Sequence, residues 1–387
     1  MEFIDLKAQQ HQMNEDGITL REDIDKRIRL VLDHGKYILG PEVRELEEKL
    51  ADYVGVRHCL GVSSGTDALI IALMALGIKA GDEIITTPFS FFATVEAILL
   101  LGAKPVFVDI EKDTYNINPQ NLEPAISRKT KAILPVSLFG QPSNFREINK
   151  IGTSYKIPII EDGAQSFGSK HHGKRSCSLS TIGTTSFFPS KPLGCYGDGG
   201  ACFTNDDLLA KRMREISIHG QNQRYTHNQV GINGRLDTLQ ATILLAKLKF
   251  FEKEVTSRER IGSKYTNLLQ EKGFLQTPFV AEENSSVYAQ YTIQVENREK
   301  IVNLLKDQSI PTSIHYPTLL SDQKALNKVN KGILQKIFPR KVYKVYSSDQ
   351  ATKASKRVLS LPMHPCLNDD DQILVINHLI DANKSIN

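Results

Sequence analysis

The sequence predicts an α/β protein with a large, mostly parallel sheet covered by helices on both faces and a smaller α/β domain at the C-terminal end. From about residue 53 to residue 205, helical stretches alternate with short runs rich in Ile, Val and Phe, which is typical of parallel strands joined by crossover helices. After residue 236 the pattern changes to one long amphipathic, charged helical region. A chain of 387 residues is long enough to build both cores.

The short apolar runs are expected to be the strands of the large sheet, and Pro and Gly mark the joints between the units. These runs are residues 83–87, 105–110, 132–138, 157–161, 185–188 and 201–204. Because parallel strands are buried on both faces, such continuous apolar runs favour a covered sheet over one with a solvated face.

The C-terminal part is expected to begin within the long helix at 236–269, which divides the chain into residues 1–250, the large domain with an N-terminal arm, and residues 251–387, the small domain. A strand-helix-strand unit is predicted at 288–295, 298–306 and 312–315, with a last helix after Asn368. The segment 321–344 is rich in Lys and Asn, and we interpret it as a solvated surface excursion without a function.

Charge and cysteine content exclude several classes of protein. The net charge is +4 and the basic residues are dispersed among acids, so the sequence indicates neither a nucleic-acid nor a membrane partner. The longest apolar runs, such as 97–101, are too short to span a bilayer, and the N-terminal residues resemble no signal segment. Five cysteines without a Cys-x-x-Cys pair favour reduced thiols in a cytoplasmic enzyme.

Lys191 is the first candidate for chemistry. Two prolines, Pro189 and Pro192, flank it on stiff backbone after an apolar run and before a glycine-rich turn. Lysine becomes a nucleophile when desolvation or a nearby cation lowers its pKa, and the aldehyde of pyridoxal 5'-phosphate (PLP) is a typical covalent partner. An ordinary surface lysine in a turn is the alternative.

Asp162 is the second candidate, because it ends the predicted buried strand at 157–161. Open α/β sheets bind ligands at the carboxyl ends of their strands. A carboxylate beside the pyridine nitrogen of PLP favours the protonated ring that draws electrons from the substrate. A helix N-cap is the alternative role for an Asp in this position.

Two further segments suit a flat, phosphorylated ligand. Residues 63–67, Ser-Ser-Gly-Thr-Asp, precede the helical run 68–76, and the N–H groups at a helix start form a phosphate site. A capping box would look similar. Residues 87–94 carry three phenylalanines, one of which could cover a pyridine face, although core packing is the commoner fate of Phe.

In their order along the chain, these motifs resemble the DegT/DnrJ/EryC1/StrS family of nucleotide-sugar aminotransferases. The resemblance rests on Ser-Gly-Thr at 64–66, the aromatic loop, Glu-Asp-Gly-Ala-Gln at 161–165, Ser-Phe-Phe-Pro-Ser-Lys at 186–191, Gly-Asp-Gly-Gly at 197–200 and Gly-Ile-Asn-Gly-Arg-Leu-Asp at 231–237. It extends from about Phe3 to the C-terminal helix, and it implies the aspartate-aminotransferase-like fold of PLP enzymes, fold type I.

The resemblance also implies a role for single residues of this sequence. Lys191 would bond covalently to PLP, and Asp162 would pair with the pyridine nitrogen. Gln165 would contact the ring hydroxyl, and Phe91 would stack on the ring where the family often has Trp or Tyr. The phosphate would be held by Gly65, Thr66 and Ser186, and by Asn233 from the neighbouring subunit, which implies a homodimer with shared active sites.

Four more motifs look like one subgroup of the family, which acts on a UDP-linked 3-oxo uronate. They are His-Gly-Lys-Tyr-Ile-Leu-Gly-Pro at 34–41, His-Gly-Gln at 219–221, Ser-Val-Tyr-Ala-Gln-Tyr at 286–291 and Ser-Ile-His-Tyr-Pro at 313–317. The residues that would line the sugar-nucleotide site are Gly35, Tyr37, Ser190, Arg235, His315 and Tyr316. A planar guanidinium can grip a uronate carboxylate with two hydrogen bonds, whereas a structural salt bridge is the alternative role for Arg235.

The resemblance therefore implies transfer of an amino group from L-glutamate to the C3 ketone of a UDP-linked 2-acetamido uronate, for bacterial surface polysaccharide. Transamination at C4 of a 4-keto-6-deoxy sugar is an open alternative. A sugar dehydratase is disfavoured because that branch has His in place of the lysine, and this chain has Lys191. A PLP-binding regulator without turnover is disfavoured because the large domain begins almost at once, without a DNA-binding appendage.

Overall fold

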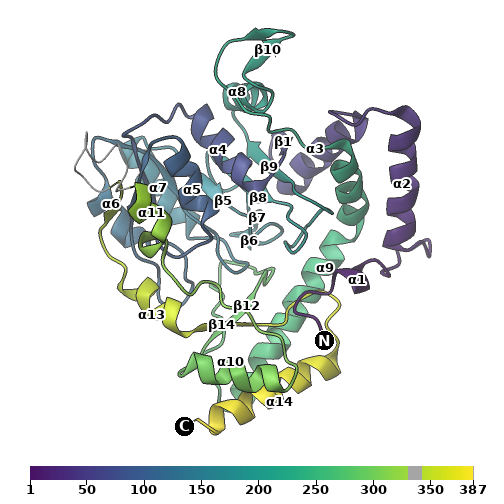
Figure 1. Cartoon of the computed structure of the whole chain (residues 1–387), viewed down its shortest axis with the longest axis vertical. Helices are drawn as coiled ribbons and strands as arrows, with labels where there is room; N and C mark the ends of the chain where they lie inside the picture. The colour runs from purple at the N-terminus through teal and green to yellow at the C-terminus, as the bar shows by residue number, and fades with distance from the viewer. Residues whose placement is uncertain (330–341, 387) are drawn as a thin grey trace.

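The structure is a computed structural model that describes residues 1–329 and 342–386. A large sheet with its helices forms one part of the molecule, and a smaller group of helices and strands lies at the opposite end of the long helix α9 (Thr238–Glu271), which runs between them (Figure 1). The projected domain boundary at residue 250 falls inside this unbroken helix and stays a prediction.

The large sheet is mostly parallel, as predicted. Its parallel strands lie in the order β13 (Lys344–Val345), β3 (Lys104–Phe107), β2 (Glu83–Thr86), β4 (Thr130–Leu134), β5 (Ile160–Asp162) and β8 (Ile182–Ser186), with β4 and β5 joined by single bridges. Two more strands follow, β9 (Gly200–Thr204), antiparallel to both neighbours, and β1 (His58–Val62). The carboxyl ends of the parallel strands thus share one edge.

Helices cover both faces of this sheet. Ile84 on β2 packs in a core with α4 (Gly65–Ala75), α5 (Ala93–Leu100) and α8 (Asp207–Ser217), whereas the next residue, Ile85, packs in the core under α7 (Phe145–Tyr155). Alternate side chains of a strand point to opposite faces, so the apolar runs are buried on both sides. Short helical turns connect the units at η1 (Pro119–Asn121) and α6 (Leu122–Ala125).

The N-terminal helices pack against α9. α1 (Leu6–Gln9) precedes α2 (Leu20–His34), which begins with a capping box between Thr19 and Glu22 and ends at Gly35, whose φ of 67° suits a residue without a Cβ. Leu20 and Ile24 of α2 share a core with Phe250 of α9, and α3 (Pro41–Val54) follows. This arrangement places the loop between α2 and α3 beside the start of α9.

The small domain contains an antiparallel pair, β12 (Tyr291–Gln294) and β14 (Val358–Leu361), with α10 (Arg298–Asp307), α13 (Asp349–Arg357) and α14 (Asp369–Lys384). The predicted strand at 312–315 is wrong. Only Ser313 makes a single bridge, to Ser360 of β14. This bridge lies on the edge of β14 away from β12, and Pro311 and Pro317, which cannot donate to a ladder, flank the segment.

The interpretation of 321–344 as a solvated excursion is wrong for the part that the structure describes. Leu326, next to η2 (Leu320–Asp322) and within α11 (Lys324–Val329), is fully buried in a core with Phe107. β13 extends the edge of the sheet beside β3, and the Lys344 Nζ lies 2.7 Å from a carboxylate oxygen of Glu83. Residues 330–341 lie outside the described part of the chain.

Two hairpins complete the structure, β6 (Lys170–His171) with β7 (Lys174–Arg175), and β10 (Gln221–Gln223) with β11 (Thr226–His227). The second projects from the body at the top of Figure 1. Within the described ranges, every helix is too short or too polar to cross a membrane.

Candidate active site

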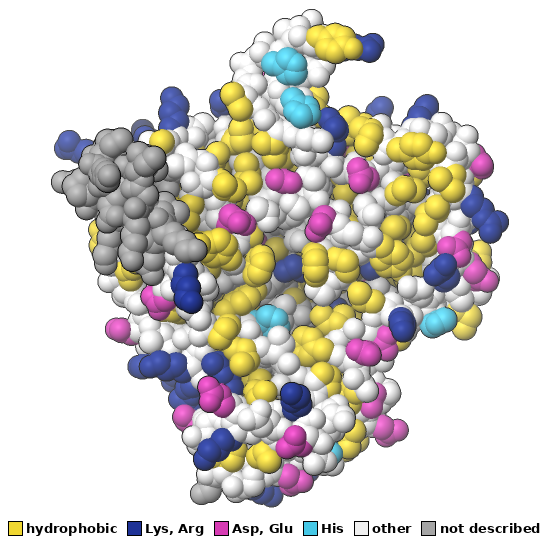
Figure 2. Space-filling model, viewed as in Figure 1, with side chains coloured by type: hydrophobic (Ala, Val, Ile, Leu, Met, Phe, Trp, Pro, Cys, Tyr) yellow, Lys and Arg dark blue, Asp and Glu magenta, His cyan; other side chains and the backbone are white. Residues whose placement is uncertain are grey.

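A pocket of about 430 Å³ lies at the carboxyl end of β5 and is lined on another side by His315 and Tyr316, which follow α10. The face shown in Figure 2 is hollowed near its centre, with hydrophobic side chains around the hollow. The pocket brings together most of the residues expected at a site, namely Gly65, Thr66, Phe91, Asp162, Gln165, Ser186, Ser190, Lys191, His315 and Tyr316.

Asp162 is the last residue of β5 and is 6% exposed. Its Oδ2 accepts a hydrogen bond from the Thr94 hydroxyl at 2.9 Å, and its Oδ1 accepts one from the backbone N–H of Ala164 at 3.2 Å. Burial raises the pKa of Asp162, and these two hydrogen bonds and the charge of Lys191 oppose that rise. A buried carboxylate held in this way is ready to meet a cationic group in the pocket.

Lys191 follows β8, and its backbone N–H donates to the Phe188 carbonyl at 2.8 Å. Burial lowers the pKa of the Lys191 amine, and the charge of Asp162 partly opposes this. Because desolvation disfavours the ammonium form, a larger share of this amine is unprotonated than in a solvated lysine. Both groups line the same pocket, so a nucleophilic amine and a carboxylate are available to one bound molecule.

The start of helix α4 forms a second part of the pocket wall. The Ser64 side chain accepts from the Asp67 N–H at 3.0 Å as the N-cap, and the N–H groups of the first helical residues have no partner inside the helix. A Cβ added at Gly65 would lie 2.6 Å from the Cβ of Ser186. Glycine therefore allows Ser186 to pack against a helix terminus that favours an anion.

Gln165 connects the large sheet to Tyr316. Its Oε1 accepts from the Phe139 N–H at 3.0 Å, and its Nε2 donates to the Tyr316 hydroxyl at 3.0 Å. Burial raises the pKa of Tyr316, so the phenol stays neutral. Phe91 lies 6.2 Å from the Tyr316 ring between centroids and is 57% exposed, which leaves its ring available to a flat ligand.

Some pocket residues were not singled out in the sequence. Thr94 positions Asp162, and its place at the end of the aromatic segment 87–94 is the signal that could have found it. Asp198 belongs to the Gly-Asp-Gly-Gly motif, which drew attention only to its glycines. Gln290 and Ser90 also line the pocket; each lies inside a segment that the sequence analysis singled out, 286–291 and 87–94, but neither residue was given a role.

Four expected residues lie outside this pocket. Asn233 is exposed beside Ile218, and Gly35, Tyr37 and Arg235 lie on the same side of the molecule. The Tyr37 carbonyl accepts from the Thr238 N–H at 3.0 Å, and the backbone of Arg235 forms a bridge with Val62. The pocket of a single chain therefore does not include Gly35, Tyr37, Asn233 and Arg235.

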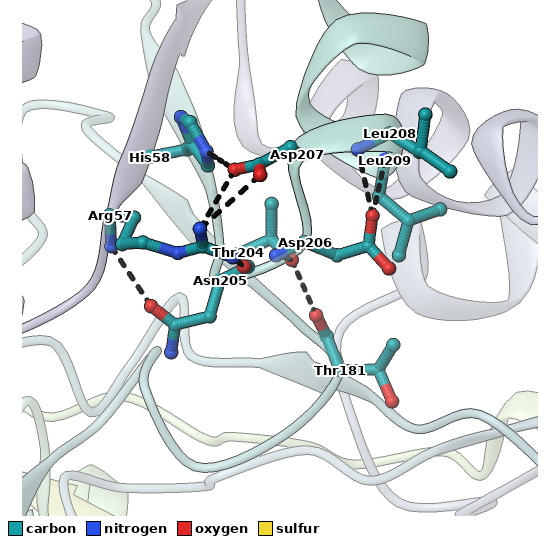
Figure 3. Close-up of polar contacts among 9 residues, drawn as sticks. All are labelled: Arg57, His58, Thr181, Thr204, Asn205, Asp206, Asp207, Leu208 and Leu209. Carbon is teal, nitrogen blue, oxygen red and sulfur yellow. Dashed lines mark hydrogen bonds and ion pairs between the residues drawn. The ribbon is translucent and has the colours of Figure 1, made fainter.

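A second surface cavity, of about 510 Å³, lies where β1, β9 and α8 meet. Figure 3 shows that its charged groups bind one another: Arg57 and His58 both reach Asp207, at 3.1 Å and 2.7 Å. Asp206 accepts from the N–H groups of Leu208 and Leu209 as the N-cap of α8. These interactions tie the strand ends to the helix, so the charged groups drawn in Figure 3 are paired with one another or with the backbone.

Comparison with known proteins shows the family of the chain. The sequence model of the DegT/DnrJ/EryC1/StrS aminotransferase family matches residues 19–380. The chain belongs to the DegT/DnrJ/EryC1/StrS aminotransferase family. It is 52% identical over 368 residues to UDP-2-acetamido-2-deoxy-3-oxo-D-glucuronate aminotransferase of Pseudomonas aeruginosa, covering 95% of this chain and 96% of that protein.

Solved structures of the DegT/DnrJ/EryC1/StrS family have the same fold. An aminotransferase of this family from Brucella abortus is 39% identical and superposes with a TM-score of 0.90 over 99% of both chains. The ntda protein of Bacillus subtilis, solved with bound cofactor pmp, is 32% identical with a TM-score of 0.84, over 96% of this chain and 83% of that one. The expected aspartate-aminotransferase-like fold is confirmed.

Proposed function

We propose that this protein transfers an amino group from L-glutamate to the C3 ketone of UDP-2-acetamido-2-deoxy-3-oxo-D-glucuronate, with PLP as its cofactor. The observation that carries the proposal is the shared pocket of Lys191 and Asp162, in which burial shifts the pKa of the lysine down and that of the carboxyl up. The substrate is supported by the 52% identical relative from Pseudomonas aeruginosa, which is named for it.

The residues of the pocket fit PLP. Lys191 is a desolvated amine for its aldehyde, and Asp162 is a buried carboxylate for its pyridine nitrogen. The start of α4 offers N–H groups for the phosphate, in a cradle that a Cβ at Gly65 would fill. Gln165 and Phe91 line the same pocket. Gln165 would contact the ring hydroxyl, and Phe91 would cover the ring face. The family membership and the pmp-bound Bacillus subtilis relative support the same cofactor.

When bound, PLP supplies an electron sink that lets a proton leave and return at the carbon that carries the transferred nitrogen. The residues of this chain do the rest. The Lys191 amine holds and returns that proton as base and then acid. Thr94 and the Ala164 N–H hold the Asp162 carboxylate in place, where it would pair with the ring nitrogen.

A uronate substrate gives Arg235 a role. The Nε of Arg235 is buried and has no hydrogen-bond partner among the described residues, so its guanidinium retains donors for a ligand carboxylate. Ser190, His315 and Tyr316 would contribute contacts from the pocket, and Gly35 and Tyr37 would contribute from the surface that carries Arg235.

We further propose a homodimer in which that surface closes the partner's pocket. Apolar side chains gather over the α2 side of the face in Figure 2. Leu30 and Leu32 of α2 are 53% and 55% exposed, and the adjoining Tyr37, Ile38 and Leu39 are 48%, 54% and 45% exposed. An exposed apolar patch of this kind marks a protein interface, and a two-fold interface would place Asn233 and Arg235 of each subunit at the other's site.

We propose a cytoplasmic location and a step in making a bacterial surface polysaccharide, such as an O-antigen of lipopolysaccharide. All five cysteines are free thiols, and four of them are buried, which suits a reducing compartment. The product would be a UDP-linked 2-acetamido-3-amino uronate for such a polymer.

The proposal is tested by adding each substrate to the purified protein with PLP. L-glutamate should bleach the absorbance of the enzyme-bound cofactor near the visible range, and the 3-oxo uronate should restore it. NMR of the product then identifies the carbon that carries the new amine. Amination of a C4 ketone, or absence of bleaching with any amino acid, would contradict the proposal.

A further inference from the structure

One chain of hydrogen bonds leads from the small domain into the pocket. His315 lines the pocket, and its Nδ1 lies 2.9 Å from the Oγ of Ser360 on β14. The Ser360 Oγ in turn lies 2.9 Å from the Oγ1 of Thr292 on β12. Ser360 and Thr292 are 0% and 1% exposed, so bulk water does not compete for their hydroxyl groups.

The backbone and two aromatic rings fix the orientation of His315. The Ser313 N–H donates to the Ser360 carbonyl at 3.1 Å, and the Ser360 N–H donates to the Ser313 carbonyl at 2.8 Å. The imidazole centroid lies 6.2 Å from the Phe3 ring and 5.6 Å from the Tyr316 ring. The segment before the imidazole is thus held against β14, and the ring is packed on two sides.

The positions of the protons along the hydrogen bonds from Thr292 to His315 follow from counting the donors and acceptors. Each hydroxyl has one proton to donate. If Thr292 donates to Ser360 and Ser360 donates to Nδ1 of His315, both hydroxyl protons have an acceptor. In the reverse order, the Thr292 proton would have no acceptor among the described residues, at a site where burial makes an unpaired donor costly. The first order leaves the imidazole proton on Nε2.

We propose that Ser360 is a positioning residue: it holds His315 as the neutral tautomer with its proton on Nε2, where the ring donates a hydrogen bond to an oxygen of the bound substrate. This inference rests on the proposed transamination for the identity of that substrate. The tautomer itself rests only on the geometry of Thr292, Ser360 and His315.

The surroundings of Nε2 of His315 are consistent with donation of a hydrogen bond from this atom to a substrate. Within the described residues, the polar side chain next to Nε2 is Ser313, whose Oγ lies at 3.5 Å, the outer limit of a hydrogen bond. A carbonyl or carboxylate oxygen of a substrate could replace this weak contact. Burial, with the charge of Lys191 as a lesser cause, lowers the pKa of His315 to about 4, which keeps the ring neutral near pH 7.

The direct test is nitrogen NMR of the holoenzyme labelled with ¹⁵N in histidine, with the His315→Gln variant used to assign the signal. We expect the long-range ring correlations of the Nε2–H tautomer in the wild type. Thr292→Val should keep this tautomer, since Nδ1 remains the acceptor for the Ser360 proton. Ser360→Ala should give a mixture of tautomers. An Nδ1–H tautomer in the wild type, or an unchanged tautomer in Ser360→Ala, would overturn the proposal.

Kinetics of the two half-reactions test the consequence. Ser360→Ala should lower the rate constant over KM by about 10-fold in the half-reaction whose substrate oxygen meets Nε2, as expected for the loss of one hydrogen bond, and by much less in the other. The matched control is Ser355→Ala, a buried serine of α13 whose hydroxyl donates to the Thr352 carbonyl within the same helix. Equal losses in both half-reactions, or a loss no larger than in the control, would contradict positioning through His315.

The NMR experiment tests the positioning of His315, and the activity assay tests the proposed function, so either proposal can be contradicted without the other. If the protein aminates no sugar but shows the Nε2–H tautomer that depends on Ser360, the proposed function is wrong and the positioning of His315 stands. If it aminates the uronate but shows the other tautomer, the positioning is wrong and the function stands.

Discussion

At the scale of single residues, Asp162 carries the charge on which the proposed chemistry depends. Asp162→Asn keeps the shape of the side chain but removes the negative charge, so the ring nitrogen of the cofactor would lose its protonated form. We expect turnover to fall by roughly 10²- to 10³-fold or more, because a fixed charge is removed from every proton-transfer step. Single-turnover rates with L-glutamate measure this loss.

The control for Asp162→Asn is Thr94→Val, which removes one hydrogen bond to the carboxylate but keeps its charge. A hydrogen bond to a charged group contributes roughly 1.5–3 kcal/mol, so this variant should lose less activity than Asp162→Asn. Wild-type turnover by Asp162→Asn would show that the residue is only a cap for the Ala164 N–H.

The neighbouring carboxyl, Glu161, predicts a pH dependence of stability. Glu161 is 0% exposed, and burial raises its pKa to about 7 against hydrogen bonds from Ser176 and the Cys177 N–H. The folded state therefore keeps a proton that the unfolded state releases near its ordinary pKa. The free energy of unfolding should fall as pH rises through this interval, by about 3 kcal/mol from this group.

Glu161→Gln isolates that effect, since glutamine does not titrate. Urea unfolding between pH 5 and pH 8 should show a steeper loss of stability for the wild type than for the variant. Parallel curves for the two proteins would mean that Glu161 is ionised throughout this range in the folded state.

At the scale of elements, the start of helix α4 is the most sensitive contact of the proposed phosphate site. In Gly65→Ala the new Cβ would lie 2.6 Å from the Ser186 Cβ, so either the helix terminus or β8 must shift. Overpacking of this kind typically costs about 1–3 kcal/mol, and we expect weaker PLP binding of roughly 5- to 150-fold. Equilibrium dialysis with PLP measures it.

Gly197→Ala is a matched control for Gly65→Ala, because the nearest atom to its new Cβ would be the Gln240 Nε2, at 3.1 Å. Hydrogen bonds to the Tyr196 backbone hold the Gln240 amide, but a contact of this length needs only a small shift, so this variant should bind PLP almost as the wild type does. If Gly65→Ala binds PLP equally well, the start of α4 does not hold the phosphate.

Sequence patterns predicted a strand correctly where a short apolar run marks it. Apolar runs located β2, β3, β4, β5, β8 and β9 of the large sheet within a few residues, whereas the buried strand β1 was not among the predicted strands. β14 was missed because its four residues follow α13 directly, and its pairing with β12 joins segments far apart in the chain. β13 was missed because Lys344 and Val345 carry no strand pattern and depend on the edge of β3.

At the scale of the molecule, the fold explains which site residues could be predicted. The motifs identified Lys191, Asp162 and Ser186 because strand ends of a parallel sheet meet at one edge, as the pocket shows. No local pattern marked the Ser360 contact of His315, since it joins two segments that lie far apart in the chain. A sequence motif also does not show whether a residue contributes to the active site of its own subunit or to that of its partner, and this question is open for Asn233.

The dimer with shared sites predicts complementation between two impaired variants. Lys191→Ala removes the nucleophile, and Asn233→Ala removes the proposed phosphate contact on an exposed surface outside the chain's own pocket. In a mixed dimer, one site would combine the intact Lys191 of one subunit with the intact Asn233 of the other. A random equal mixture contains about half mixed dimers, each with one of its two sites restored, so activity should reach about one quarter of wild type.

The measurement is turnover after the two variants are unfolded together, refolded and purified as dimers, compared with each variant refolded alone. Each alone should be strongly impaired, Lys191→Ala completely. If Asn233 acted within its own chain, every site in the mixed dimer would lack either Lys191 or Asn233, and activity would not exceed half that of Asn233→Ala alone. Recovery toward one quarter of wild type therefore requires that Asn233 reaches the partner's site, and full activity in a demonstrated monomer would contradict it.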